Sequence, residues 1–109
     1  MRRHRVNLII IAGLIILGLV ILRSFLKVGF RQTHDGEMHL ARLANLNLAF
    51  HDHNFPFRWA RSLNYEFGLP IFNFYYYLLE LLAFIPMKLG LTIEHSLKLV
   101  TILSYLGAA

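Results

Sequence analysis

The chain has 109 residues, 57% of them hydrophobic, and a mean hydropathy of +0.53. This composition is too apolar for an ordinary soluble domain. The formal net charge of +5 does not predict nucleic-acid binding, because the basic residues flank apolar runs, where lipid headgroups would lie. The absence of cysteine excludes disulfides, thiolate nucleophiles and cysteine-based zinc sites.

The first predicted element is a transmembrane helix over residues 6–26. The run from Val6 to Leu22 has Asn7 as its only polar side chain, and a helix of that length spans about 25 Å. Extension to Leu26, with Arg23 snorkelling, would cover the roughly 30 Å of a bilayer core. The alternative is a signal peptide, but the run exceeds the usual apolar region and no small-x-small cleavage site follows it.

Residues 29–70 are expected to form an extracytoplasmic loop with amphipathic helices on the membrane surface. Residues 36–50 have helical periodicity, with Leu43 and Leu46 near one face and His39, Arg42 and Asn45 near another. A second short interfacial stretch is expected to begin at residues 55–59.

Two further apolar runs follow, over residues 71–89 and 97–109. The first is predicted to be a second transmembrane helix, and the other is too short to cross a bilayer and is expected to begin a third. The predicted fold class is therefore all-α: one membrane region over residues 1–109, a fragment of a polytopic membrane protein. Its partners would be the lipid bilayer and the remaining helices of a larger chain.

The densest group of ionisable residues follows the first apolar run. Asp35 is the first candidate for a catalytic base, and Glu37 is the second candidate carboxylate. On a helix, Asp35, His39 and Arg42 would share one face, so that the imidazole and guanidinium could keep the carboxylate ionised and hold a phosphate. The structural alternative is that Asp35 only caps the helix and that the other side chains are solvated.

Glu80 falls inside the second apolar run, where a carboxylate is costly and usually faces a cavity or a partner. We expect it either to bind substrate or to be hydrogen-bonded to a neighbouring helix. A divalent metal as cofactor is left open, although the spacing matches no closed zinc motif. Its candidate ligands would be His34, Asp35, Glu37, His39, His51, Asp52 and His53.

Three segments resemble one family of bacterial membrane proteins. They are D-G-x-x-H-x-x-R over residues 35–42, P-F-R-W over residues 56–59 and G-x-P-x-F-x-F-Y over residues 68–75. In this order they resemble the polytopic proteins labelled "6-pyruvoyl-tetrahydropterin synthase-related", which look like GT-C glycosyltransferases. Phe57 departs from the contiguous Pro-Arg-Trp of that pattern.

The resemblance implies a multi-pass protein of the inner (cytoplasmic) membrane with a cytoplasmic N-terminus; charge alone leaves the orientation open. It implies transfer of a sugar from a polyprenyl-phosphate donor to an extracytoplasmic acceptor, with Asp35 as the base. Arg42 and Arg58 would bind the donor phosphate. Trp59 would bind the substrate together with them; the alternative is that Trp59 anchors the chain at the membrane interface. The competing hypothesis is a small, non-catalytic membrane anchor or assembly subunit.

Overall fold

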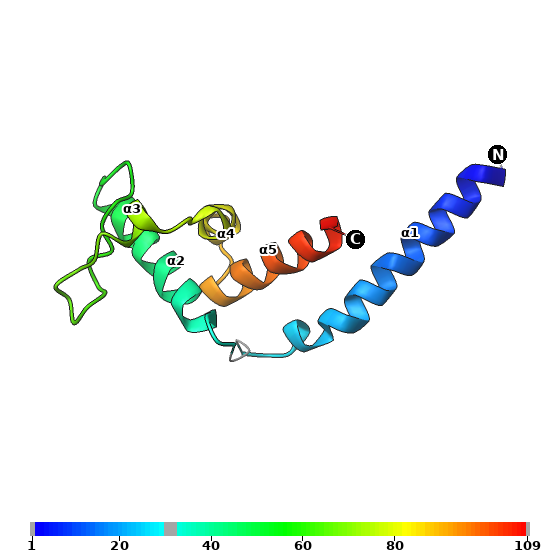
Figure 1. Ribbon diagram of the computed structural model, residues 1–109, viewed down its shortest axis with the longest axis horizontal. Helices are drawn as coiled ribbons and strands as arrows, with labels where there is room; N and C mark the ends of the chain where they lie inside the picture. The colour runs from blue at the N-terminus through cyan, green and yellow to red at the C-terminus, as the bar shows by residue number, and fades with distance from the viewer. Residues whose placement is uncertain (1, 30–32, 109) are drawn as a thin grey trace.

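The computed structural model describes residues 2–29 and 33–108, and this part of the chain is helical with irregular connections. Its elements are α1 (Arg2–Ile21), the 3-10 helix η1 (Leu22–Leu26), α2 (Gly36–His51), α3 (Ile71–Phe74), α4 (Leu78–Lys88) and α5 (Ile93–Ala108). Figure 1 shows α1 running away from the packed body formed by α2, α4 and α5. The all-α prediction is confirmed.

The predicted transmembrane helices are not found. Among the described residues, no helix combines the length and the apolar character needed to cross a bilayer. In the first run, the α-helix gives way to η1 at Leu22. The described apolar side chains of α1 therefore extend from Val6 to Ile21, about 24 Å against a core of roughly 30 Å. The predicted span over residues 6–26 is wrong.

The second apolar run is divided in two. Helix α3 ends at Phe74, Tyr75 adopts an extended conformation (φ −121°, ψ 136°), and α4 begins only at Leu78. Helix α4 has 11 residues and is about 17 Å long. The predicted span over residues 71–89 is therefore wrong.

The predicted third segment, 97–109, lies within α5, and residue 109 itself falls outside the described residues. Helix α5 has 16 residues, or about 24 Å. The assignment of the chain as a polytopic membrane fragment is accordingly corrected to an all-helical fold.

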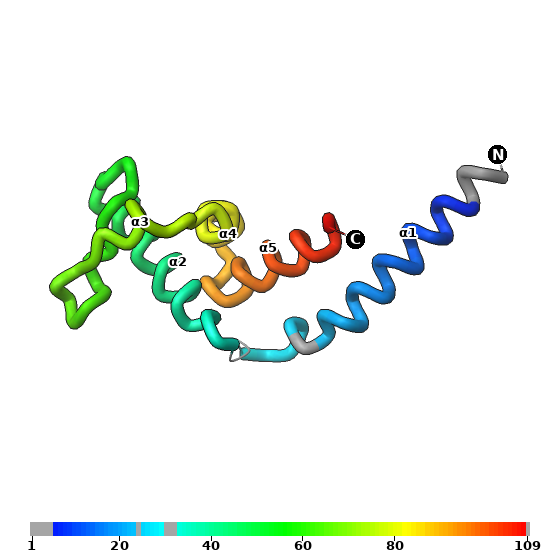
Figure 2. The backbone as a smooth tube through the Cα atoms, viewed as in Figure 1, coloured from blue at the N-terminus to red at the C-terminus, as the bar shows by residue number. Residues whose placement is uncertain are grey.

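The expected loop over residues 29–70 agrees in part with the structure. The helix predicted over 36–50 is present as α2, whereas residues 55–59 form no helix; residues 30–32 lie outside the described part. Figure 2 shows the chain between α2 and α3 making an irregular excursion at the end of the molecule opposite α1. Two backbone hydrogen bonds between Ala60 and Leu69, of 2.8 and 3.0 Å, close this excursion.

Gly68 is required where the excursion closes. Its φ of +80° lies in the left-handed region that favours glycine, and a Cβ placed there would collide with the indole of Trp59. Trp59 therefore packs directly against the backbone of the turn.

Helix α2 is the centre of the core. Its fully buried Leu46 packs in a cluster with Phe57 and Phe72, and its fully buried Leu43 packs in a second cluster with Leu97 of α5. The apolar face predicted for this helix is thus confirmed. Two residues of its polar face, Arg42 and Asn45, are buried as well, and Asn45 accepts hydrogen bonds from the backbone and hydroxyl of Ser62.

Lys98 connects the first part of the chain to the helical body. It is buried on α5, and its Nζ donates a hydrogen bond of 2.8 Å to the carbonyl of Lys27 and another to the carbonyl of Gly29. An ammonium group buried in this way is stabilised because backbone oxygens replace its water.

We expect Lys98→Met to lower the free energy of unfolding by about 1–3 kcal/mol, because two carbonyls lose a charged donor. Hydrogen exchange should also become faster in η1, which directly precedes the two carbonyls that Lys98 binds. Thermal denaturation and amide exchange would measure both effects. Lys27→Met is the matched control, since it changes an exposed side chain and keeps the accepting carbonyl. Equal stability of both variants would contradict this assignment.

Candidate functional site

A cluster of ionisable side chains joins the first turns of α2 to the first turn of α4. The Nδ1 of His39 lies 2.8 Å from Oε1 of Glu80, and Nη1 of Arg42 donates to the same oxygen at 3.3 Å. The exposed fraction of the side chain is 0% for Glu80, 4% for Arg42 and 26% for His39. The carboxylate is therefore enclosed, and the imidazole is the member of the three that reaches solvent.

The helical spacing explains why these groups meet. His39 and Arg42 are three residues apart, so they project from one face of α2. That face packs against α4, where Glu80 and Ala83 are buried on a common face. A buried carboxylate is tolerated when charged partners and hydrogen bonds compensate the lost water, and α2 supplies both.

Tyr75, in the break between α3 and α4, packs against the cluster, and Tyr76 stacks on Tyr75. The guanidinium carbon of Arg42 lies 3.8 Å from the ring centroid of Tyr75, a cation–π contact. The rings of Tyr75 and Tyr76 are stacked, with centroids 4.8 Å apart. Within the described residues, Nε of Arg42 and Oε2 of Glu80 are buried without a hydrogen-bond partner. The cluster therefore retains hydrogen-bonding capacity that the fold leaves unused.

Asp35 precedes the first residue of α2 and is exposed, and its side chain makes no capping hydrogen bond. The interpretation of Asp35 as a helix cap is therefore not supported. His39 and Arg42 are not paired with Asp35, as the shared face suggested, but with Glu80. Asp35 is left as a solvated carboxylate next to the cluster.

The environment of Tyr76 links the tyrosines to Asp35. A side-chain hydrogen bond with Tyr75 raises the pKa of Tyr76 above its ordinary value of 10.0, and the charge interaction with Tyr75 acts in the same direction. The negative charge of Asp35 raises this pKa further, whereas the positive charge of Arg42 lowers it. Tyr76 is thus within electrostatic range of both residues and is a neutral hydrogen-bonding group at physiological pH.

We expect Tyr75→Phe to lower the pKa of Tyr76 toward 10.0, because the hydrogen bond that raises it is removed. The effect of this pKa shift on stability depends on pH. A pKa raised by folding contributes stability that is present below pH 10.0 and is lost as the pH rises through the folded-state pKa. Carbon-13 NMR of the tyrosine Cζ signals would follow the titration. An unchanged Tyr76 midpoint in the variant would contradict the interaction.

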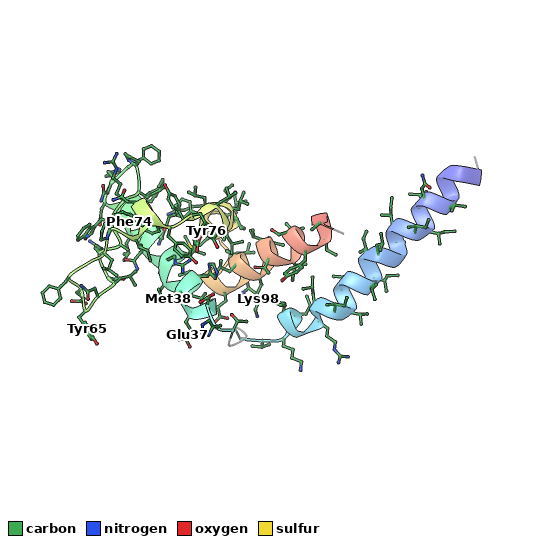
Figure 3. The ribbon with its side chains drawn as sticks, viewed as in Figure 1. Glu37, Met38, Tyr65, Phe74, Tyr76 and Lys98 are labelled. Atoms are coloured by element: carbon green, nitrogen blue, oxygen red, sulfur yellow. The ribbon has the colours of Figure 1, made fainter. Side chains whose placement is uncertain are left out.

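The structure separates the other predicted site residues from this cluster. Glu37 is exposed on the first turn of α2, and Figure 3 shows it near the lower edge of that helix, with Tyr76 near the start of α4. Arg58 and Trp59 belong to the irregular excursion, where Trp59 lies against Gly68. Tyr75 and Tyr76 were not among the predicted site residues. The sequence signal that could have identified them is the G-x-P-x-F-x-F-Y segment, which ends at Tyr75.

The candidate metal ligands do not assemble. In the described part of the chain, no group of three or more histidine, aspartate or glutamate side chains is placed to hold a metal ion. Asp52 instead forms an ion pair of 3.0 Å with Arg61, and His51 lies 3.4 Å from the ammonium of Lys88. These residues are engaged with basic side chains.

Comparison with known proteins gives no relative for this chain. No protein-family model matches it, and neither a curated protein nor a solved structure is significantly similar to it. Its function is therefore argued from the chemistry of the cluster.

Proposed function

We propose that this chain provides the acceptor-activating site of a GT-C-like glycosyltransferase, which moves a sugar from a polyprenyl-phosphate donor to an extracytoplasmic acceptor. The observation that carries the proposal is the exposed Asp35, whose side chain makes no capping hydrogen bond, at the start of the helix that carries His39 and Arg42 of the cluster with Glu80. A solvated carboxylate next to hydrogen-bonding groups is an arrangement that can accept a proton from a substrate hydroxyl.

The transfer step uses Asp35 as the base. The acceptor hydroxyl attacks the anomeric carbon of the donor sugar and forms a new carbon–oxygen bond, while the bond from that carbon to the phosphate oxygen breaks. The hydroxyl proton passes to the carboxylate of Asp35, and the polyprenyl phosphate leaves with the bonding electrons. Glu37 is the second exposed carboxylate on the same turn of helix.

The donor phosphate needs a cationic partner. Arg42 is buried between Glu80 and Tyr75, so its charge is already compensated in this arrangement. Arg58 is exposed and remains a candidate for the phosphate, with Trp59 next to it in sequence. Arg42 therefore has a structural role, and Arg58 binds the donor phosphate.

The experiment is a transfer assay on the full chain with a panel of radiolabelled polyprenyl-phosphate sugars and an extract of envelope glycans as acceptor. The expected result is label in the glycan fraction and release of polyprenyl phosphate in equal amounts. Label released as free sugar would indicate hydrolysis, and no release with any donor would contradict the proposed activity.

A second candidate function is a non-catalytic assembly subunit. It is favoured by the exposed apolar side chains along α1 and by a groove of about 420 Å³ between α4 and α5, lined by residues that include Leu82, Pro86 and Leu103. Contiguous exposed apolar surface is typical of protein–protein contacts. This hypothesis predicts that Leu82→Glu, which places a charge in the groove, abolishes association with a partner protein, whereas Asp35→Asn leaves that association unchanged.

A further inference from the structure

We infer that a cavity between η1 and α5 binds a small carboxylic acid with an apolar chain, and that Lys98 binds its carboxylate. The cavity shares no residue with the His39–Arg42–Glu80 cluster, so the inference is independent of the proposed function.

The cavity has a volume of about 310 Å³ and lies where η1 and the residues after it face α5. Figure 3 shows Lys98 on the side of α5 that is turned toward this segment. Small-molecule sites usually have about 300–1,000 Å³ and an apolar lining with a few polar groups. This cavity is at the lower end of that range, and its apolar lining consists of Phe25, Leu26, Val28, Leu91, Leu99 and Ile102.

Lys98 supplies a buried positive charge to the lining. The residue is 6% exposed, and within the described residues no carboxylate lies within ion-pair distance of its ammonium. An ammonium has three N–H donors, and two of them are taken by the carbonyls of Lys27 and Gly29. A buried charge is costly unless an opposite charge lies near it. The remaining donor and the unbalanced charge therefore favour an anion in the cavity.

The neighbouring ionisable groups do not cancel this charge. Lys27 also lines the cavity, and among the described residues no aspartate or glutamate does. Glu94 precedes Lys98 by one turn of α5, but it neither forms an ion pair with Lys98 nor belongs to the lining. His95 lines the cavity and has its Nδ1 2.7 Å from Oγ1 of Thr92. The formal charge of the lining is therefore positive.

A carboxylate on an alkyl chain matches both properties of the cavity. Its single negative charge balances one ammonium, whereas a phosphate monoester carries more than one negative charge at neutral pH. A hydrogen bond between two charged groups is also stronger than one between neutral groups. The chain would cover the apolar lining, and each methylene that it buries should raise the affinity about fourfold. The ligand class is thus a fatty acid of short or medium chain length.

The experiment is a calorimetric titration of the full chain with octanoate at about pH 7, where a free carboxylic acid is ionised. Octanol has the same chain without the charge and should bind at least about tenfold more weakly. Butyrate should bind more weakly than octanoate by about fourfold for each buried methylene that it lacks, and octyltrimethylammonium, with the opposite charge, should not bind. Equal affinity for octanoate and octanol, or for octanoate and octyltrimethylammonium, would overturn the inference.

Lys98→Met tests the role of the ammonium. This variant should lose the preference for octanoate over octanol, and this ratio of affinities is the deciding measurement because a merely structural role of Lys98 would not change it. Lys88→Met is the matched control, since it removes a lysine from the end of α4 that is bonded to Asn47 and lies outside the cavity. A ratio that is equal in Lys98→Met and in the parent protein would show that Lys98 does not bind the carboxylate.

Leu91→Trp tests the cavity while it keeps Lys98. The larger ring should reduce the binding of octanoate and of octanol alike, with unchanged circular dichroism. Leu103→Trp is its control, because Leu103 lines the groove between α4 and α5 and not this cavity. Binding that is reduced in Leu103→Trp but retained in Leu91→Trp would place the ligand in that groove and overturn the inference.

Discussion

Replacing Glu80 with alanine should destabilise the protein by about 3–5 kcal/mol, the largest effect that we expect from a single substitution. The carboxylate is fully buried and accepts hydrogen bonds from both Arg42 and His39. Its removal leaves a guanidinium buried between helices with no opposite charge, next to a void where the side chain was. Urea denaturation followed by circular dichroism would give the free energy of unfolding.

Two controls test whether the missing partner, rather than the lost volume, causes this effect. Glu37→Ala removes an exposed carboxylate from α2 and should change the free energy of unfolding by less than about 0.5 kcal/mol. The double variant Arg42→Met/Glu80→Leu removes both charges and should be more stable than Glu80→Ala alone. If the double variant is instead destabilised by the sum of the effects of Arg42→Met and Glu80→Leu measured singly, the ion pair does not couple the helices.

Asp35→Asn should lower the rate of sugar transfer by about 10²- to 10⁴-fold, because an amide cannot take up the proton of the acceptor hydroxyl. Folding should be preserved, since the Asp35 side chain is exposed and makes no capping hydrogen bond. The measurement is the initial rate of transfer from the polyprenyl-phosphate donor identified by the panel, together with the thermal midpoint of the variant.

Glu37→Gln is the matched variant, two residues along the chain and equally a carboxylate-to-amide change. A loss of transfer in Glu37→Gln with near-normal turnover in Asp35→Asn would move the role of base to Glu37. Near-normal turnover in both variants would remove the carboxylate mechanism.

The sequence by itself determined the local elements. The periodicity of residues 36–50 fixed α2 within one residue at its C-terminal end, because its leucines recur on one face and a helix is stabilised by such local spacing. The spacing of His39 and Arg42 likewise determined that they share a side, and the predicted helical segments together gave the all-α class. These properties depend on residues within a few turns of one another.

Apolar runs alone did not determine how long the helices are. Residues 71–89 read as one continuous segment, yet the chain leaves the helix at Tyr75, whose ring stacks on Arg42. A contact between residues 33 positions apart has no signature in local hydropathy, so the division into α3 and α4 could not be predicted from the run itself. The same reasoning applies to α1, where η1 follows at Leu22.

Only the tertiary structure decided that Arg42 and Asn45, on the polar face of α2, are buried, and which group neutralises the cations of this helix. From the sequence, Asp35 was the nearest partner for His39 and Arg42, because it stands on the same helix. In the fold, Glu80 approaches from a position about 40 residues away and takes both. The physical reason is desolvation: once α4 packs on α2, a buried carboxylate and a buried guanidinium are stable only together, whereas Asp35 remains in water.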